Sequence, residues 1–129
     1  MTRILIDTHT FLWFIEDHPK LSSAAKHILE NEAQITYLSI ASLWEIAVKI
    51  CARKLKLPRE FGLYIPDQLN RNAITVLDLT VTHTAMLTTL PLHHSEPFDR
   101  TIASQALVEE LPLLSADKAM DAYGLQRIW

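Results

Sequence analysis

The chain has 129 residues, 49% of them hydrophobic, so it is long enough to bury one core, and we expect a single domain over residues 1–129. Its single cysteine, Cys51, excludes a disulfide framework and a thiolate cluster for zinc or iron–sulfur, and it favours a reducing, cytoplasmic location. The net charge of -3 gives no overall electrostatic argument for nucleic-acid binding, and the two glycines form no phosphate-binding loop.

Membrane insertion and secretion are not expected. The longest run without a full charge, residues 79–95, is interrupted by threonines, Pro91 and three histidines, so it does not suit a membrane span. No apolar segment of signal-peptide length follows Arg3.

Strand and helix patterns alternate along the first half of the chain. Residues 3–6 predict a short apolar strand, 8–17 a helical turn or two, 23–31 a helix with serines at its start, and 34–40 a second strand. Ser39 suits the cap of a helix over residues 40–54. The core stripe that we expect on this helix consists of Ile40, Leu43, Ala47, Ile50 and Cys51.

The second half continues the alternation. Pro58 and Pro66 punctuate two short helical pieces or one kinked helix, and residues 73–79 predict a third strand. Thr80 suits the cap of a helix that ends at Pro91. A helix over residues 98–110, a strand over 111–115, a short helix over 116–123 and a terminal strand over 125–129 follow. This order predicts an α/β fold with a parallel sheet, whose ligand site lies at the carboxyl ends of the strands.

Four acids stand at positions that this fold would bring together. Asp7 and Asp117 directly follow apolar strands, Asp99 lies in the first turn of a helix, and Glu45 interrupts an apolar helix. Taken singly, each has an ordinary explanation as a helix cap, a partner of the helix dipole or a surface residue. Together they would repel one another unless a divalent cation neutralised them, and Mg²⁺ or Mn²⁺ prefers such all-oxygen ligands. The cluster therefore predicts hard-metal chemistry on a phosphodiester.

Four segments carry a family resemblance: "ILIDTHTFLW", "SIASLWEIAVK", "LHHSEPFDRTIASQA" and "LPLLSADKAMDAYGLQRIW". In this order they resemble the signature segments of PIN-domain proteins, specifically the small VapC-type ribonuclease toxins, and the resemblance spans nearly the whole chain. It implies a three-layer α/β/α fold with a short parallel sheet flanked by helices. It also implies a Mg²⁺-dependent endoribonuclease, with Mn²⁺ as a substitute, acting as the toxin of a type II toxin-antitoxin pair. RNA is then the substrate, an antitoxin protein the partner and a homodimer the expected assembly.

The same resemblance assigns roles to individual residues. It implies that the metal-binding and catalytic acids are Asp7, Glu45, Asp99 and Asp117. Thr8 and Ser115 match positions where the family has a hydroxyl that helps to order the site. Asp121 either adds a further acid or is a solvated helix residue. The implied reaction is metal-assisted hydrolysis of RNA that leaves a 5′-phosphate and a 3′-hydroxyl and needs no side-chain nucleophile.

A basic stretch between residues 49 and 59 suggests RNA contacts. Lys49, Arg53, Lys54 and Lys56 continue the helix that bears Glu45, and they either guide RNA phosphates or form a solvated helix end. Arg100 either contacts substrate or locks a carboxylate.

Aromatic and histidine side chains have plainer explanations. Trp13 and Trp44 are expected to pack in the core. The histidines at positions 83, 93 and 94 lack the spacing of a zinc site. His9 stands close to the end of the first strand and is expected to approach the acids.

Three other functions stay open at this point. The chain is alternatively an RNA-processing nuclease outside a toxin-antitoxin pair, or a non-catalytic RNA-binding domain, although all four acids are present. A phosphatase with Asp7 as the nucleophile is disfavoured, because such enzymes usually have a second acid two residues on, where this chain has His9.

Overall fold

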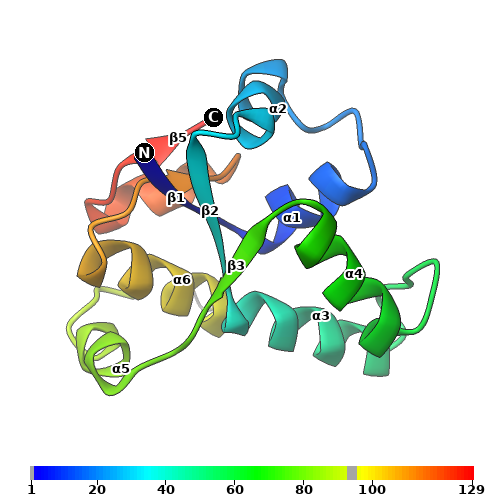
Figure 1. Cartoon of the computed structure of the whole chain (residues 1–129). Helices are drawn as coiled ribbons and strands as arrows, with labels where there is room; N and C mark the ends of the chain where they lie inside the picture. The colour runs from blue at the N-terminus through cyan, green and yellow to red at the C-terminus, as the bar shows by residue number, and fades with distance from the viewer. Residues whose placement is uncertain (1, 93–95) are drawn as a thin grey trace.

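The computed structural model describes residues 2–92 and 96–129. Its centre is a parallel sheet with the strand order β3-β2-β1-β4-β5 (Figure 1). The strands are β1 (Thr2–Ile6), β2 (Gln34–Ser39), β3 (Ile74–Leu77), β4 (Leu113–Leu114) and β5 (Arg127–Ile128). Leu5 of β1 lies opposite Tyr37 on one side and Leu113 on the other. The predicted α/β fold with a parallel sheet is confirmed.

Helices connect the strands, and most of them begin at a side-chain cap. They are α1 (Thr8–Ile15), α2 (Ser23–Glu30), α3 (Ile40–Cys51), α4 (Phe61–Arg71), α5 (Val81–Leu87) and α6 (Pro97–Val108), followed by the 3-10 helix η1 (Lys118–Tyr123). The predicted caps Ser39 and Thr80 both accept a hydrogen bond from a backbone N–H of the helix that they precede. Pro66 lies inside α4, which is one helix rather than two pieces.

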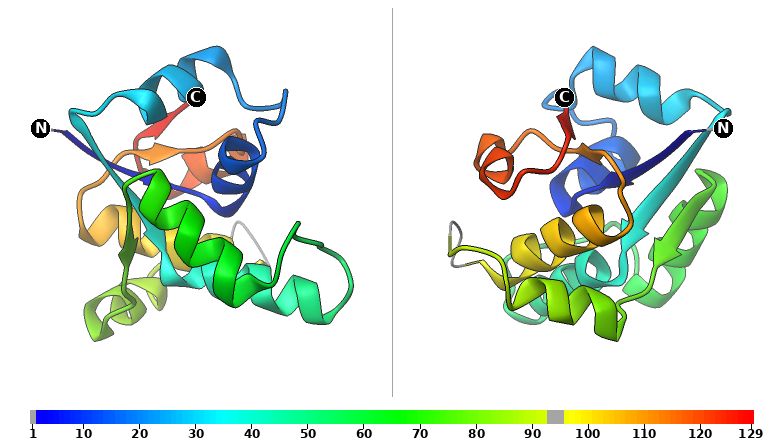
Figure 2. Two further views of the ribbon diagram at one scale, coloured as in Figure 1. Left: turned by 45° about the vertical axis from the view of Figure 1, so that its right-hand side comes forward. Right: turned by 90° about the vertical axis from the view of Figure 1, so that its left-hand side faces the viewer.

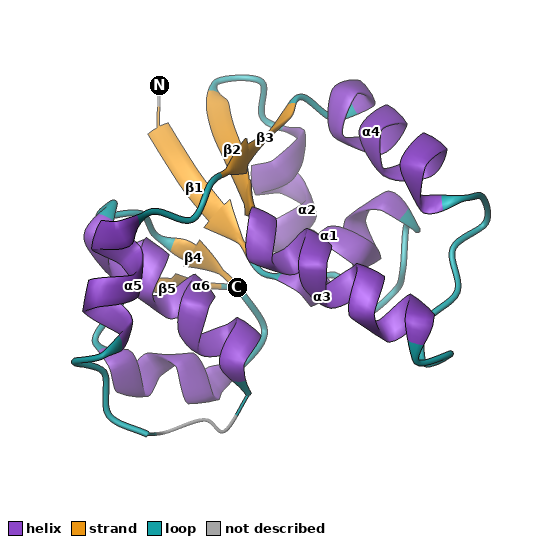
Figure 3. Cartoon of the chain, turned by 90° about the horizontal axis from the view of Figure 1, so that it is seen from below, coloured by secondary structure: helices purple, strands orange, loops and turns teal. Residues whose placement is uncertain are grey.

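The sheet separates two cores, as expected for three layers. Alternate residues of β1 face opposite sides, so that Ile4 and Ile6 join one buried cluster and Leu5 joins the other. The first cluster takes side chains from α1 to α4, and the second takes them from α6 and η1. Figure 3 shows α1 to α4 on one side of the strands and α5 and α6 on the other.

The predicted core stripe of α3 is correct only in part, because Leu43 and Ile50 pack against the first core cluster while other members do not. Ile40 and Cys51 are exposed, whereas the buried face carries Ala41, Ser42, Glu45 and Ile46. The reason is that α3 contacts α1 and α6 and turns Glu45 inward between them. Figure 2 shows α3 leading directly from the end of β2 and running along the lower edge of the molecule.

The two tryptophans that we expected in the core differ in burial. Trp44 is 64% exposed, so its predicted core role is wrong, whereas Trp13 packs against the first core cluster as predicted. The longest helices among the described residues, α3 and α6, have 12 residues each, so no described helix can cross a membrane.

Candidate active site

Asp7 is fixed at the point where β1 ends and α1 begins. It is buried, and its Oδ1 accepts a hydrogen bond of 2.9 Å from the backbone N–H of Thr10, which caps α1. Its Oδ2 accepts a hydrogen bond of 2.5 Å from the hydroxyl of Ser115, just after β4. Because β1 and β4 are parallel neighbours, their carboxyl ends meet at one edge and bring these two residues together.

Glu45 enters the same region from α3 and is only 3% exposed. Its Oε1 accepts a hydrogen bond of 2.6 Å from the hydroxyl of Thr8, and its Oε2 lies 2.6 Å from the ammonium group of Lys49, one helical turn further on. The hydroxyl oxygen of Ser42 lies 2.9 Å from that of Thr8. Since the single Thr8 proton is directed at the carboxylate, the Ser42 hydroxyl donates to Thr8. Thr8 therefore connects the first turn of α1 to α3.

The pKa of Asp99 is affected by the other acids. Burial, as the largest cause, and the negative charges of Glu45, Asp7, Glu96 and Asp117 together raise the pKa of Asp99 from its ordinary value of 3.8 to about 6. Such mutual repulsion requires these carboxylates to lie within electrostatic reach of one another. The structure thus brings together four acids from β1, α3, α6 and the segment after β4.

Ser115 links Asp7 to Asp117. Its hydroxyl oxygen accepts a hydrogen bond of 3.1 Å from the backbone N–H of Asp117 while its proton goes to Asp7. The Asp117 side chain caps η1 by accepting from the N–H of Ala119. Both aspartates therefore cap a short helix and face the site at the same time.

Asp121 is connected to the four acids only indirectly, through Arg127. It is exposed and accepts two hydrogen bonds from Arg127, at 2.8 and 3.3 Å. The hydrogen bond from Arg127 is the main cause that lowers the pKa of Asp121. Arg127 in turn donates to the backbone carbonyl of Ser115. Asp121 thus orients the arginine that holds the Ser115 backbone.

An open cavity of about 280 Å³ adjoins these acids. It is lined by Asp7, His9, Trp13, Asp99, Ala116 and Asp117. His9 is exposed here, and its ring lies 5.8 Å from that of Trp13. The histidine near the first strand end therefore reaches the cavity of the acids, as the sequence suggested.

Whether a divalent ion fits this site depends on the oxygen donors that are present. Within residues 2–92 and 96–129, no group of three or more His, Cys, Asp or Glu side chains is arranged to hold a metal ion. The oxygens of Asp7 and Glu45 are already engaged by protein donors, Lys49 among them. Each carboxylate oxygen still keeps a second lone pair, however, and the Lys49 side chain is 35% exposed, so it borders on solvent. The donor set fits Mg²⁺ in chemistry and charge, and binding requires a movement of side chains.

The predicted RNA-binding cations do not form one group. Lys49 is paired with Glu45. The guanidinium group of Arg100 donates to the carbonyls of Leu87, Leu90 and Pro91, so it closes the end of α5, and within the described residues it pairs with no carboxylate. The exposed residues Arg53, Lys54 and Lys56 follow α3 and line a separate groove.

The histidines of the rejected zinc site have other positions. His83 is fully buried, accepts from the Thr80 N–H and contacts Glu109 at 3.0 Å, so it fastens α5 to α6. His93 and His94 lie outside the described residues.

Sequence reasoning missed Ser42, and it assigned Lys49 to RNA without its pairing with Glu45. Ser42 lies three residues before Glu45, and Lys49 lies four residues after it, so both share its helix face. That spacing is a signal for a side chain that positions Glu45. The apolar residues of α3 mask this signal, because they form a helical pattern of their own.

Comparison with known proteins assigns the chain to a family. A family model described as the PIN domain matches residues 4–125. The chain belongs to the PIN domain family. Ribonuclease VapC16 of Mycobacterium tuberculosis is 33% identical over 72 residues, which cover 53% of this chain and 51% of that protein. The match therefore spans about half the length of this curated relative.

Solved structures share the PIN fold. A chain of the VapBC2 complex of Rickettsia felis, crystallised with a fragment of its promoter DNA, superposes with a TM-score of 0.73 at 17% identity and covers 98% of both chains. A chain of FitAcB from Neisseria gonorrhoeae has a TM-score of 0.66 at 16% identity, covering 98% of this chain and 96% of that chain. At these identities the likeness shows the fold alone.

Proposed function

We propose that this PIN-domain chain is a divalent-metal-dependent endoribonuclease and the toxin of a type II toxin-antitoxin pair. The observation that carries the proposal is the convergence of Asp7, Glu45, Asp99 and Asp117, whose negative charges add to the effect of burial in raising the pKa of Asp99 to about 6. Membership of the PIN family and the partial likeness to a curated ribonuclease support RNA as the substrate.

The proposed cofactor is Mg²⁺, with Mn²⁺ as a substitute, held by the four acids. When bound, such an ion lowers the pKa of a water molecule and stabilises the charge that develops at the scissile phosphate. Ser115 and the Thr10 N–H hold Asp7 in one orientation, and Thr8 does the same for Glu45. Once Lys49 leaves Glu45, its ammonium group is available to a phosphate of the RNA.

The test is cleavage of a labelled single-stranded RNA with Mg²⁺, with EDTA and by the variant Asp99→Asn. We expect cleavage only by the wild type with metal, and an unchanged rate for the matched control Asp78→Asn, an exposed aspartate after β3. Cleavage that survives both EDTA and Asp99→Asn would reject metal catalysis. A folded wild type that binds RNA without cutting it would indicate the non-catalytic alternative, and hydrolysis of a phosphomonoester alone would indicate a phosphatase.

A homodimer is part of the proposal. Ile40, Trp44 and Val48 lie at successive turns of α3 and are all exposed, and the Trp44 ring meets that of Phe98 edge-on at 5.3 Å. This apolar face suits a second copy of the chain. Light scattering after gel filtration should give a dimer for the wild type and a monomer for Trp44→Ser. A wild type that stays monomeric at high concentration would contradict this part.

The antitoxin is proposed because the solved relatives come from two-component complexes. A small adjacent gene for a DNA-binding protein, whose product blocks cleavage on co-expression, would support it. Active enzyme without such a gene would favour an RNA-processing role outside a toxin-antitoxin pair. The cytoplasmic location stays a prediction.

A further inference from the structure

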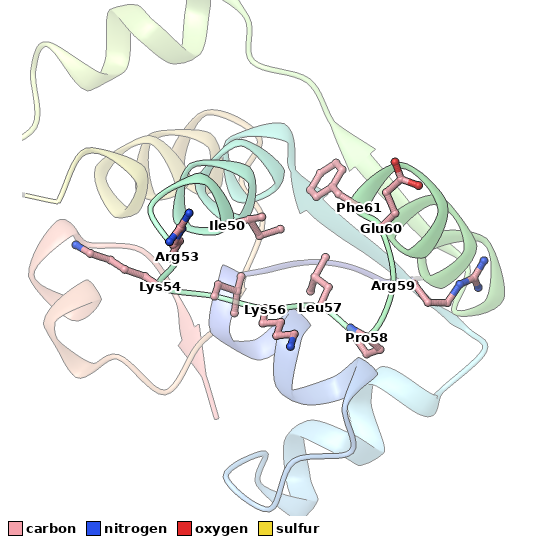
Figure 4. Close-up of a pocket in the computed structure, with 10 residues that line it drawn as sticks. Ile50, Arg53, Lys54, Lys56, Leu57, Pro58, Arg59, Glu60 and Phe61 are labelled. Carbon is pink, nitrogen blue, oxygen red and sulfur yellow. The ribbon is translucent and has the colours of Figure 1, made fainter.

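The groove at the carboxyl end of α3 is chemically distinct from the cavity of the acids. It has a volume of about 860 Å³ and is lined by residues 50 and 53–61, none of which lines the cavity beside Asp7 and Asp99. Its floor is apolar and consists of Ile50, Leu55, Leu57 and Phe61, which pack against the first core cluster. Figure 4 shows Ile50, Leu57 and Phe61 pointing toward the space between α3 and α4.

The rim of the groove is cationic. Arg53, Lys54, Lys56 and Arg59 are all exposed, and Glu60 is the one acid among the lining residues. In the described part of the chain, none of these four cations forms an ion pair. Lys54 and Arg59 lie at opposite ends of the groove in Figure 4. The rim therefore offers several unpaired positive charges around an apolar floor.

The backbone of residues 55–57 is also unpaired. This segment belongs to no helix or strand, and its N–H and C=O groups make no hydrogen bond within the described residues. Its side chains alternate as in a strand: Lys54 and Lys56 are exposed, and Leu55 and Leu57 are partly buried. Pro58 holds Leu57 away from helical torsion angles. A strand-like segment with free backbone groups is a template for the addition of another strand.

We propose that this groove binds an extended, acidic peptide segment of a partner protein, which pairs with the backbone of residues 55–57. Apolar side chains of the peptide enter the floor, and its carboxylates meet Lys54, Lys56 and Arg59. RNA would match the cations of the rim, but its backbone is charged along its whole length and leaves the apolar floor unused. The combination of floor, rim and free backbone favours a peptide.

The probe is a fluorescein-labelled peptide of alternating Glu and Leu, and its binding is measured by fluorescence anisotropy at physiological salt. We expect it to bind more tightly than peptides of alternating Lys and Leu or of alternating Glu and Ser. The double variant Lys54→Glu/Lys56→Glu should weaken binding about tenfold. The matched control Arg3→Glu/Lys20→Glu changes two exposed cations elsewhere and should not alter binding.

Amide hydrogen exchange distinguishes pairing of the peptide with residues 55–57 from nonspecific electrostatic attraction to the cations. Within residues 54–60, we expect the bound peptide to slow the exchange of the amides of residues 55 and 57. Equal binding of the Glu/Ser peptide, unchanged exchange at these amides, or equal losses in both double variants would each overturn the proposal. It would also be overturned if an oligouridylate bound this groove, with its affinity lost in Lys54→Glu/Lys56→Glu, while the Glu/Leu peptide did not bind. None of these outcomes depends on nuclease activity.

Discussion

Replacing Asp99 by asparagine should stabilise the metal-free protein in a pH-dependent way. Folding raises the pKa of Asp99 from 3.8 to about 6, so the folded state binds this proton more tightly than the unfolded state does. The wild type therefore loses stability as the pH rises from about 4 to about 6, and the loss is constant above that range. At about 1.36 kcal/mol per pH unit the loss is at most about 3 kcal/mol. Asp99 is partly exposed, and solvent screening reduces the loss to about 1.5 kcal/mol.

The assay is thermal unfolding of wild type and Asp99→Asn in EDTA from pH 4 to pH 8. A gain of about 1.5 kcal/mol corresponds to a melting temperature higher by about 6 °C for a chain of this length. We expect this difference above pH 7 and almost none at pH 4, because a protonated Asp99 is as neutral as asparagine. Added Mg²⁺ should then stabilise the wild type but not the variant. A difference that is independent of pH, or a variant that melts lower at pH 8, would refute the electrostatic coupling.

Three further substitutions probe the groups that hold the acids, each measured by melting at pH 8 in EDTA. Asp7→Asn should lower stability by about 1 kcal/mol, because Asp7 accepts hydrogen bonds from Ser115 and Thr10, and a gain would contradict this. Ser115→Ala should cost about 2 kcal/mol, and a neutral result would show that the hydrogen bond to Asp7 contributes nothing. Lys49→Met leaves the buried Glu45 without its cation and should lower the free energy of unfolding by about 2 kcal/mol, less than for a fully buried pair. The same Lys49→Met change made in a Glu45→Gln protein should cost less, because no buried charge is then left unpaired; an equal cost would contradict this reasoning.

The features that sequence predicted well have local causes. Caps such as Ser39 and Thr80 depend on a side chain and the N–H groups within the next few residues, so a short stretch of sequence is enough to predict them. The alternation of strand and helix then fixed a parallel sheet, and the sheet placed Asp7 and Asp117 at one edge. The two aspartates were predictable because Asp7 directly follows β1 and Asp117 comes three residues after the end of β4.

The features that sequence missed depend on tertiary contacts. The orientation of α3 is set by its contacts with α1 and α6, and those contacts favour burying Glu45 with Thr8 and Lys49 over burying Trp44. An apolar pattern alone assigns the stripe to the core, because it assumes that burial follows hydrophobicity. That pattern cannot show that the Glu45 carboxylate is stable in a buried position because Thr8 and Lys49 bind its two oxygens.

The acids of this site differ in how their charge affects stability, so neutralising them does not have the same effect at every position. Asp7 is held by donors from α1 and from the segment after β4, so its charge stabilises the local fold, whereas Asp99 mainly meets burial and like charges. Charge neutralisation therefore relieves the protein at position 99 and weakens it at position 7. A divalent ion would act on Asp99 in the same direction as asparagine does, by removing the repulsion, while it leaves the hydrogen bonds of Asp7 intact. The folded chain thus carries an electrostatic cost at Asp99 that a bound cation would relieve, and the hydrogen bonds of Asp7 hold that residue in place without a cation.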